Sequence, residues 1–251
     1  MRNYLILDGV DSRDFGVYIS GQGTFGAPSK AYAYHDVPGR NGAYITSDKR
    51  FDNIEVTYPA FIYANFKTNI SNFRNFLLSR DGYVRLEDTY NTDEFRLASY
   101  TGAFEPDVTS INDAGRFDIV FNCMPQRFLK SGEDKSNNVS SWTNSTRFPS
   151  KPLLEFTITT ELSFTINNSL GQWQITSSGL QSAGITSVTI DCETMQAYNT
   201  NGSLNSFITI GKIIGGETEY ATDFPVLAPG VNRFTRGTGV SVWITPRWWQ
   251  L

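Results

Sequence analysis

Residues 31–47 read AYAYHDVPGRNGAYITS, and this stretch decides the class of fold. Residues 31–37 and 43–47 are suited to strands, and they flank the turn sequence PGRNG at 38–42. Pro-Gly and Asn-Gly are strong turn dipeptides, because glycine accepts the positive φ that tight hairpins require. The stretch therefore predicts a long β-hairpin. Its apolar content is too small for a core of its own, so we expect it to project from its domain.

Strand patterns continue on both sides of the hairpin. Residues 54–58 alternate at period two, and Phe117, Ile119 and Phe121 share one face of a later strand. The strands predicted in the first half lie at 4–7, 16–20, 31–37, 43–47, 54–58, 83–87, 94–100 and 116–121. The first half is therefore expected to form a mainly β domain.

One segment has helical spacing instead. Phe66, Ile70, Phe73 and Leu77 recur at the intervals of a single helix face. The sequence Arg-Asp-Gly at 80–82 supplies a stop signal after them. This is the one helix that the sequence predicts.

The second half changes character after residue 130. Residues 130–147 are rich in Ser, Asn, Thr and charged side chains, which is typical of a linker or a long irregular connection. Beyond them, the predicted strands lie at 153–159, 162–166, 172–176, 187–191, 195–198, 224–227 and 240–244. Short strands at regular intervals without a helix indicate a β-sandwich. We therefore predict an N-terminal domain at 1–130, a linker at 131–150 and a sandwich at 151–251.

Composition bounds the class of protein. Of the 251 residues, 39% are hydrophobic and 18% are charged, which indicates a globular chain. The formal net charge of -4 argues against a nucleic-acid-binding protein, because such proteins need clustered Lys and Arg to displace counterions from phosphates. No apolar run approaches the ~18 residues of a membrane span, and charge comes too early in the N-terminus for a signal peptide. We expect a protein that folds in a cytoplasm and has no membrane partner.

Residues that could carry chemistry are few. The single histidine, His35, lies on the predicted hairpin, where we expect it to be solvated or in an interface. Cys123 and Cys192 are expected to be buried, reduced thiols, and neither a zinc site nor any other cofactor site is predicted. Carboxylate pairs for a glycosidase remain an alternative, with candidates Asp191–Glu193 and Glu217–Glu219. Surface charge is the preferred interpretation of both pairs.

All five tryptophans lie in the second half, at positions 142, 173, 243, 248 and 249. Trp243 stands between Val242 and Ile244, and we predict that it lies in the core. Trp173, Trp248 and Trp249 are candidates for binding a partner. Exposed aromatic rings can stack on sugars, whereas aromatic side chains near a terminus often anchor interfaces. Packing or assembly is the preferred interpretation, and sugar binding remains the alternative.

Several stretches in order resemble the distal tail protein (Dit) family of siphophages. They are YLILDGVDS at 4–12, DFGV at 14–17, VPGRNG at 37–42, FDIVFNCMP at 117–125, VTIDCE at 188–193, FPVLAPGVN at 224–232 and ITPRWW at 244–249. The hairpin matches a family motif of the form V-P-G-R-x-G. The resemblance extends over essentially the whole chain, and it rests on the order and spacing of these stretches.

The resemblance implies a structural role in a virion. It implies a homohexameric ring formed by the N-terminal domain and a galectin-like sandwich outside it. Such a ring is the hub between the tail tube and tape-measure proteins on one side and the tail-tip and receptor-binding proteins on the other. DNA passes through its lumen without specific binding. The protein is expected at the virion tail tip after assembly in the host bacterial cytoplasm. The residues expected at the ring interface are Tyr34, Val37, Pro38, Gly39, Arg40, Asn41 and Gly42.

Two other functions compete with the structural hub. A carbohydrate-binding module would need an exposed aromatic platform, and a cell-wall hydrolase would need two converging carboxylates in a cleft. Galectins bind sugar with a histidine and polar residues around one tryptophan, and residues 151–251 contain no histidine. We therefore expect no enzymatic activity and no millimolar binding of simple sugars.

Overall fold

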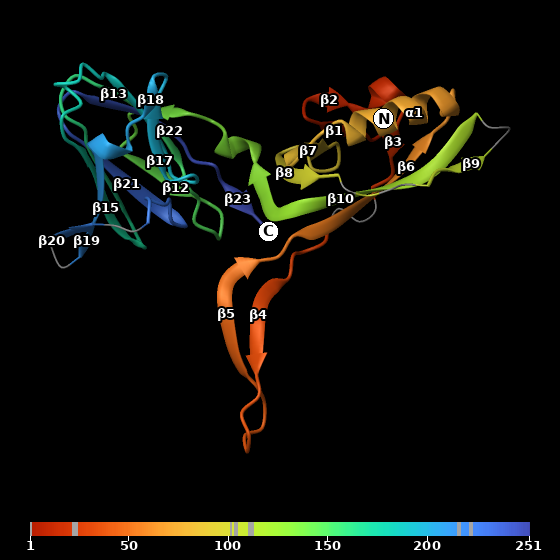
Figure 1. Cartoon of the computed structure of the whole chain (residues 1–251), viewed down its shortest axis with the longest axis horizontal. Coiled ribbons are helices and arrows are strands. Elements are labelled where there is room, and N and C mark those ends of the chain that lie inside the picture. Colours follow the sequence, from red (N-terminus) through yellow and green to blue (C-terminus); the bar gives the residue numbers. More distant parts are fainter. Residues whose placement is uncertain are drawn as a thin grey trace. The chain divides into compact units, whose positions relative to one another are not determined.

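The computed structural model describes residues 2–21, 25–100, 102, 105–109, 113–214, 217–220 and 223–251. The chain forms two compact units, one comprising the residues up to Arg127 together with Leu251 and the other spanning Phe128–Gln250. The described residues are mainly β, with α1 (Phe66–Leu78) as their one α-helix (Figure 1). The predicted fold class, a mainly β chain with one helix and a projecting hairpin, is confirmed.

The N-terminal unit is built on one large antiparallel sheet. Its strands are β1 (Leu5–Leu7), β2 (Val10–Asp11), β3 (Tyr18–Ile19), β6 (Ile54–Ile62), β7 (Val84–Asp88), β8 (Glu94–Ser99), β9 (Asp107–Thr109) and β10 (Ala114–Leu129). The order along the sheet is β2-β1-β7-β8-β10-β6-β3, and β9 also pairs with β10. The 3₁₀ turn η1 (Ser12–Phe15) connects β2 to β3.

The helix covers only one face of this sheet. Phe73 and Leu77 of α1 are buried in one apolar cluster with Phe117, Ile119 and Phe121 of β10, as the 3.6- and 2-residue periods require. The side chains that alternate with those of β10, such as Arg116 and Asp118, lie on the opposite face and are exposed. The N-terminal unit therefore has one apolar sheet face under the helix and a second face that no described helix covers, here called the uncovered sheet face, where aromatic and charged side chains mix.

The C-terminal unit contains two six-stranded sheets. The first has the order β11-β22-β13-β16-β17-β18 and the second the order β12-β21-β14-β15-β19-β20. The first comprises β11 (Ser136–Asn137), β22 (Val240–Thr245), β13 (Leu153–Ile158), β16 (Ser187–Asp191), β17 (Gln196–Asn199) and β18 (Gly202–Ser203). The second comprises β12 (Ser141–Asn144), β21 (Gly230–Arg236), β14 (Ser163–Asn168), β15 (Gly171–Ser177), β19 (Ile208–Ile214) and β20 (Glu217–Tyr220). The 3₁₀ turns η2 (Lys130–Gly132) and η3 (Asn205–Phe207) and the short strand β23 (Trp249–Gln250) complete the unit.

Apolar side chains from both sheets form a single core. Phe156 of β13 and Phe164 of β14 meet edge to face with ring centroids 5.2 Å apart, and Phe164 stacks on Phe234 of β21 at 6.0 Å. Phe156 and Phe164 are almost completely buried. The predicted β-sandwich is therefore present, whereas its galectin-like topology stays a prediction.

Two predicted stretches have a different structure, and β19 and β21 were not predicted as strands. Residues 131–150, predicted as a linker, include β11 and β12, which pair with β22 and β21 at the edges of the two sheets. Edge strands need few apolar side chains, so a polar composition does not prevent pairing. Residues 224–227, predicted as a strand, contribute only an isolated bridge from Leu227 to Ser150, because Pro225 has no N–H to donate to a ladder.

Candidate functional site

The hairpin at residues 30–51, here called the arm, consists of β4 (Lys30–His35) and β5 (Tyr44–Phe51). The two strands form a sheet of their own, with no third strand among the described residues. Tyr34 pairs with Ile45 and His35 pairs with Tyr44 across the ladder. The arm extends away from the large sheet of its unit (Figure 1). Its shape is therefore held by its own ladder and by its turn.

The predicted turn closes the arm. The amide of Arg40 donates to the carbonyl of Val37 at 3.1 Å, and Gly39 has a φ of 80°. With Pro38 at the second position and a glycine at positive φ at the third, this is a type II turn. Gly42 also has a positive φ, of 83°. The two glycines are therefore required by backbone conformation, since neither faces a neighbouring atom that would exclude a Cβ.

The arm exposes large apolar side chains on both faces. Tyr32, Tyr34 and Ile45 lie on one face, because residues opposite each other on a ladder and residues two apart on a strand share a face. They are 45%, 67% and 52% exposed, and the two tyrosine rings meet edge to face at 6.5 Å. We call these three residues the aromatic face of the arm. Tyr44 on the other face and Val37 at the turn are also exposed.

Polar contacts fix the base of the arm. The ladder shifts register between Lys30 and Tyr32, and Lys49 opposite this shift has a φ of 58°. The amide of Asp52 donates to the carbonyl of Ser29 at 3.0 Å, and Arg50 lies 3.4 Å from the Asp48 carboxylate. Such a bulge bends a hairpin and so sets its direction.

His35 lies on the arm as predicted. Its Nε2 is 3.0 Å from the hydroxyl of Thr46, and the ring is exposed. The partner of the imidazole is thus a threonine hydroxyl, whereas a catalytic triad needs a carboxylate and a nucleophile around a buried histidine. His35 is therefore a solvated side chain in this structure.

The three tryptophans proposed to bind a partner do not form a common surface. Trp173 is buried, with Nζ of Lys212 4.9 Å from its ring centroid. Trp248 is buried in the sandwich core, where it meets Trp142 edge to face at 6.0 Å. Trp249 is half-buried, stacks on Phe148 at 4.5 Å and donates from Nε1 to the carbonyl of Pro149 at 2.9 Å.

Trp243 shows the opposite behaviour. It was predicted to lie in the core, and that prediction is wrong, because its side chain is 44% exposed. Val242 and Ile244 on either side of it are completely buried. Three consecutive apolar residues give no alternation, so the sequence did not indicate which of them points outward.

The carboxylates of the candidate pair Asp191 and Glu193 each have a basic partner of their own. Asp191 accepts two hydrogen bonds from Arg247, at 2.7 and 3.0 Å. Burial by itself raises the pKa of Asp191, but the hydrogen bonds from Arg247 and from backbone amides outweigh it and lower the pKa. Glu193 is exposed and lies 3.5 Å from Lys151. The side chain of Glu217, of the other candidate pair, lies outside the described residues.

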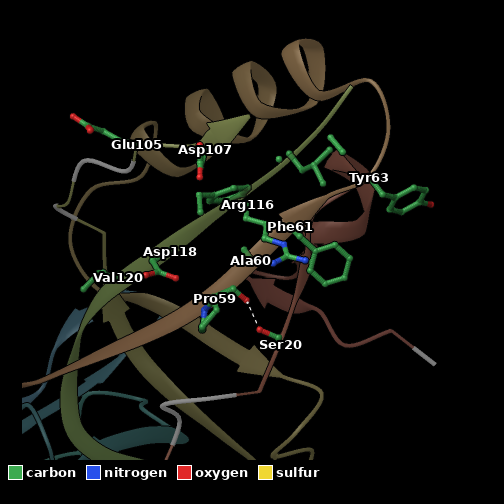
Figure 2. Close-up of a pocket in the computed structure, with 14 residues that line it drawn as sticks. Ser20, Pro59, Ala60, Phe61, Tyr63, Glu105, Asp107, Arg116, Asp118 and Val120 are labelled. Atoms are coloured by element: carbon green, nitrogen blue, oxygen red, sulfur yellow. Dashed lines mark hydrogen bonds between the residues drawn. The ribbon is translucent and has the colours of Figure 1, made fainter. Parts of the chain in front are cut away.

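A shallow depression lies on the uncovered sheet face of the N-terminal unit (Figure 2). It has a volume of about 940 Å³, and Phe61 and Tyr63 of the β6 region contribute aromatic walls. Arg116 and Asp118 of β10 line it together with Asp107 of β9. The guanidinium thus shares the depression with these carboxylates, which suits ionic contacts better than general acid catalysis.

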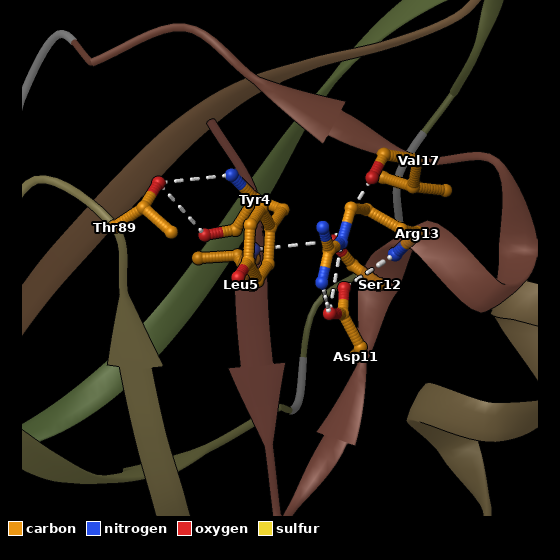
Figure 3. Close-up of polar contacts among 7 residues, drawn as sticks. All are labelled: Tyr4, Leu5, Asp11, Ser12, Arg13, Val17 and Thr89. Carbon is orange, nitrogen blue, oxygen red and sulfur yellow. Dashed lines mark hydrogen bonds and ion pairs between the residues drawn. The ribbon is translucent and has the colours of Figure 1, made fainter. Parts of the chain in front are cut away.

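The N-terminal sequence at 4–17 serves the fold (Figure 3). The buried hydroxyl of Ser12 accepts from the amide of Leu5 at 3.1 Å and donates to the carbonyl of Val17 at 2.9 Å. Asp11 accepts from the amide and side chain of Arg13, whose guanidinium lies 3.7 Å from the ring centroid of Tyr4. These contacts tie β1 to η1, so the residues that carry part of the resemblance hold the first strand in place.

The two cysteines are buried and unpaired, as predicted. Burial raises the pKa of Cys123 to about 11, and burial with the nearby Asp191 carboxylate raises the pKa of Cys192 further.

Among the residues that the structure describes, no group of three or more His, Cys, Asp or Glu side chains could hold a metal ion. The helix α1 has neither the length nor the apolar character of a membrane span, and no other described helix does.

No protein-family model and no curated protein matches this chain. Among solved structures, it is similar to the SPP1 Dit (gp 19.1) protein, described as a paradigm of the hub adsorption apparatus in phages that infect Gram-positive bacteria. The TM-score is 0.72 and the identity 14%, over 100% of both chains. Two structures of the phage P2 baseplate in its activated conformation, with Ca and with Sr, match 97% of each chain. Their TM-scores are 0.47 and 0.46, with identities of 9% and 10%. Over its full length, the chain has the fold of the SPP1 Dit protein.

Proposed function

We propose that this protein is the structural hub of a phage tail tip. In this proposal, residues 1–130 form a homohexameric ring that joins the tail tube to the host-adsorption apparatus and leaves a channel for DNA ejection. The observation that carries the proposal is the full-length similarity to SPP1 Dit at a TM-score of 0.72. The sequence resemblance, which lies in the order of seven short stretches, supports it independently.

The exposed arm supports ring formation. Large apolar side chains on a hairpin without a covering layer leave apolar surface in water, and burying that surface against a second copy is favourable. A contact between an arm and a different surface of the next copy is head-to-tail, and such contacts form a ring when the rotation between successive copies closes. An obligate ring contact buries ~2,000 Å² or more, so the arm supplies part of the interface and the body of the N-terminal unit supplies the rest.

The charge balance supports a channel that DNA does not bind. The formal net charge is -4, and Asp107 and Asp118 with Glu105 outnumber Arg116 in the depression of the uncovered sheet face. Proteins that grip DNA need clustered cations, whereas the described residues that line this depression include one arginine and no lysine. In the proposed assembly, tail tube and tape-measure proteins contact one side of the ring, and tail-tip and receptor-binding proteins contact the other. The protein acts in the virion tail and is assembled in the host cytoplasm.

The test of the ring is a mass measurement in solution. We expect the purified chain to elute as a hexamer in size-exclusion chromatography with light scattering. Deleting Tyr32–Ile45, with a short Gly-Ser turn in their place, should yield monomers in which the C-terminal sandwich still melts cooperatively. Leu170→Ala, which removes an exposed apolar side chain of the C-terminal sandwich, should leave the hexamer intact. A deletion variant that remains hexameric would exclude the arm from the interface, and a monomeric wild type would overturn the hub proposal.

The two faces of the arm permit a sharper version of this test. Tyr34→Ser with Ile45→Ser removes the aromatic face, whereas Tyr44→Ser removes the exposed ring of the opposite face. If the aromatic face is the buried one, the double variant should dissociate at protein concentrations where the single variant remains a ring. Equal effects would show that both faces are buried in the assembly.

The hub proposal includes the absence of catalysis. The His35 imidazole, the Asp191 carboxylate and the two thiols each have partners or burial that suit structure. We expect no loss of turbidity when the protein is incubated with purified bacterial cell walls. A measurable rate that Asp107→Asn or Asp118→Asn abolishes would instead support the hydrolase alternative.

A further inference from the structure

Trp243 belongs to a row of side chains that crosses one sheet of the C-terminal sandwich. Asn137 pairs with Trp243, Trp243 pairs with Glu155, Glu155 pairs with Thr189, and Thr189 pairs with Tyr198. Directly paired residues share a face of the sheet. The flanking Val242, Leu154, Val188 and Ala197 are buried in the core, so the whole row points away from it. We call these five residues the outer row.

The two ends of the outer row carry exposed aromatic rings. Trp243 is 44% exposed and Tyr198 is 37% exposed, and they stand three inter-strand steps, or ~14 Å, apart. Among the described residues, neither the Trp243 indole N–H nor the Tyr198 hydroxyl has a hydrogen-bond partner. Trp243 is also the most exposed tryptophan of the chain, since Trp173 and Trp248 are buried and the others are half-buried. The rings are thus available to a molecule outside the sandwich.

The side chains between and beside the rings are polar. Glu155 accepts from Lys135 at 2.5 Å through Oε2, which leaves Oε1 as an acceptor without a partner among the described residues. The next row of the same face consists of three hydroxyl residues, Ser241, Thr157 and Ser187. Protein interfaces concentrate their binding energy in a contiguous, water-excluding apolar centre, which the described residues of this face do not form. Hydroxyl, amide and carboxylate groups around two aromatic rings instead match a ligand that is itself rich in hydroxyl groups.

We propose that the outer row binds a neutral polysaccharide chain. The axial C–H groups of a pyranose carry small positive partial charges and stack on the negative face of an aromatic ring, here those of Trp243 and Tyr198. The hydroxyls of the sugar bond to Glu155 Oε1, Thr189 and Asn137. Lys135 neutralises Glu155, so the row favours an uncharged chain. The ~14 Å between the rings spans several sugar units, which explains binding of a chain without measurable binding of a monosaccharide. This site does not depend on ring formation.

The experiment uses the full-length protein in native gels that contain dextran, a soluble galactan or a soluble glucomannan. We expect at least one of these polymers to retard migration. Trp243→Ala should weaken the affinity about tenfold or more, and Tyr198→Ala should weaken it less, because tyrosine offers the smaller ring. Trp243→Phe keeps an aromatic face and should restore most of the affinity. Tyr63→Ala, an equally exposed aromatic in the N-terminal unit, should bind as the wild type does.

Each outcome decides the proposal. No retardation by any of the three polymers would overturn it, and so would retardation that Trp243→Ala leaves unchanged. A change in oligomeric mass on Trp243→Ala would assign the row to a protein interface and would also overturn it. Thermal melts accompany each variant, and the rescue by Trp243→Phe separates a lost ring contact from a folding defect. A monomeric wild type that still binds polysaccharide through Trp243 would retain this site while overturning the proposed ring.

Discussion

The arm and the C-terminal sandwich use the same kind of strand in opposite settings. Tyr34 of the arm is 67% exposed, whereas Phe164 in the sandwich is completely buried. Both residues are aromatic and lie on antiparallel strands, so the difference lies in what covers the apolar face. The sandwich has a second sheet for that purpose, and the arm has no covering layer among the described residues. An apolar face without its own layer indicates where a second molecule binds.

The largest difference in unfolding free energy between a covered and an uncovered side chain should appear when a tryptophan is truncated to alanine. Trp248→Ala removes a ring that is 5% exposed and packs against Trp142, and we expect it to cost ~3–5 kcal/mol of unfolding free energy. Trp243→Ala removes a ring of the same size that faces solvent, and we expect a change within about 0.5 kcal/mol. Chemical denaturation followed by far-UV circular dichroism measures both. Similar costs for the two variants would contradict the assignment of one ring to the core and the other to the surface.

A smaller loss of unfolding free energy is expected when the ion pair between Asp191 and Arg247 is removed. Asp191→Asn removes the carboxylate charge and leaves Arg247 at most one of its two hydrogen bonds, which should cost ~1.5–3 kcal/mol of unfolding free energy at pH 7. Glu193→Gln is the matched control two residues away, where an exposed carboxylate 3.5 Å from Lys151 should contribute within ~1 kcal/mol.

The contribution of the Asp191–Arg247 pair to the unfolding free energy should depend on pH. The pKa of Asp191 is lower in the folded than in the unfolded state. Its stabilisation is therefore fully present above the unfolded value of ~3.9 and is lost as the pH falls through the folded value. The difference in unfolding free energy between wild type and Asp191→Asn should shrink between pH 5 and pH 2. A difference that stays constant over this range would show that the cost comes from lost packing.

The features that the sequence predicted correctly are those that a local pattern of residues determines. The helix at residues 66–77 and the arm with its turn were predicted closely, because a 3.6-residue period and two turn dipeptides are local signals. The strands β19 and β21 were missed. In β21 the fully buried residue is Asn232, whose side chain bonds to the backbone of Ala228 at 2.8 and 2.9 Å, and a polar residue in the core interrupts the apolar alternation. The backbone groups that bond to the Asn232 side chain are brought to it by the tertiary fold, which a local sequence pattern does not show.

The candidate site was predicted only in part, for a related reason. The turn at Gly39 follows from its residues, so the sequence located the arm. The exposed Trp243 was missed, because Val242, Trp243 and Ile244 are all apolar and the phase of the strand depends on the opposing sheet. The aromatic face of the arm was likewise not identified, since the sequence does not show which sheet face remains uncovered.

The smallest effect on unfolding is expected in the arm itself, where assembly should nevertheless respond. Gly39→Val with Gly42→Val places β-branched side chains at φ values of 80° and 83°, at a strain of ~1–2 kcal/mol per residue. An added Cβ meets no atom within 4 Å at either glycine, so the strain is conformational and stays in the turn. Because the turn contributes nothing to either core, the melting of the two units should shift little while the ring dissociates.

Gly39→Asn with Gly42→Asn is the matched control, since asparagine tolerates positive φ. Light scattering should find monomers for the valine variant and rings for the asparagine variant, and a valine variant that assembles like the wild type would show that the turn has no part in the interface.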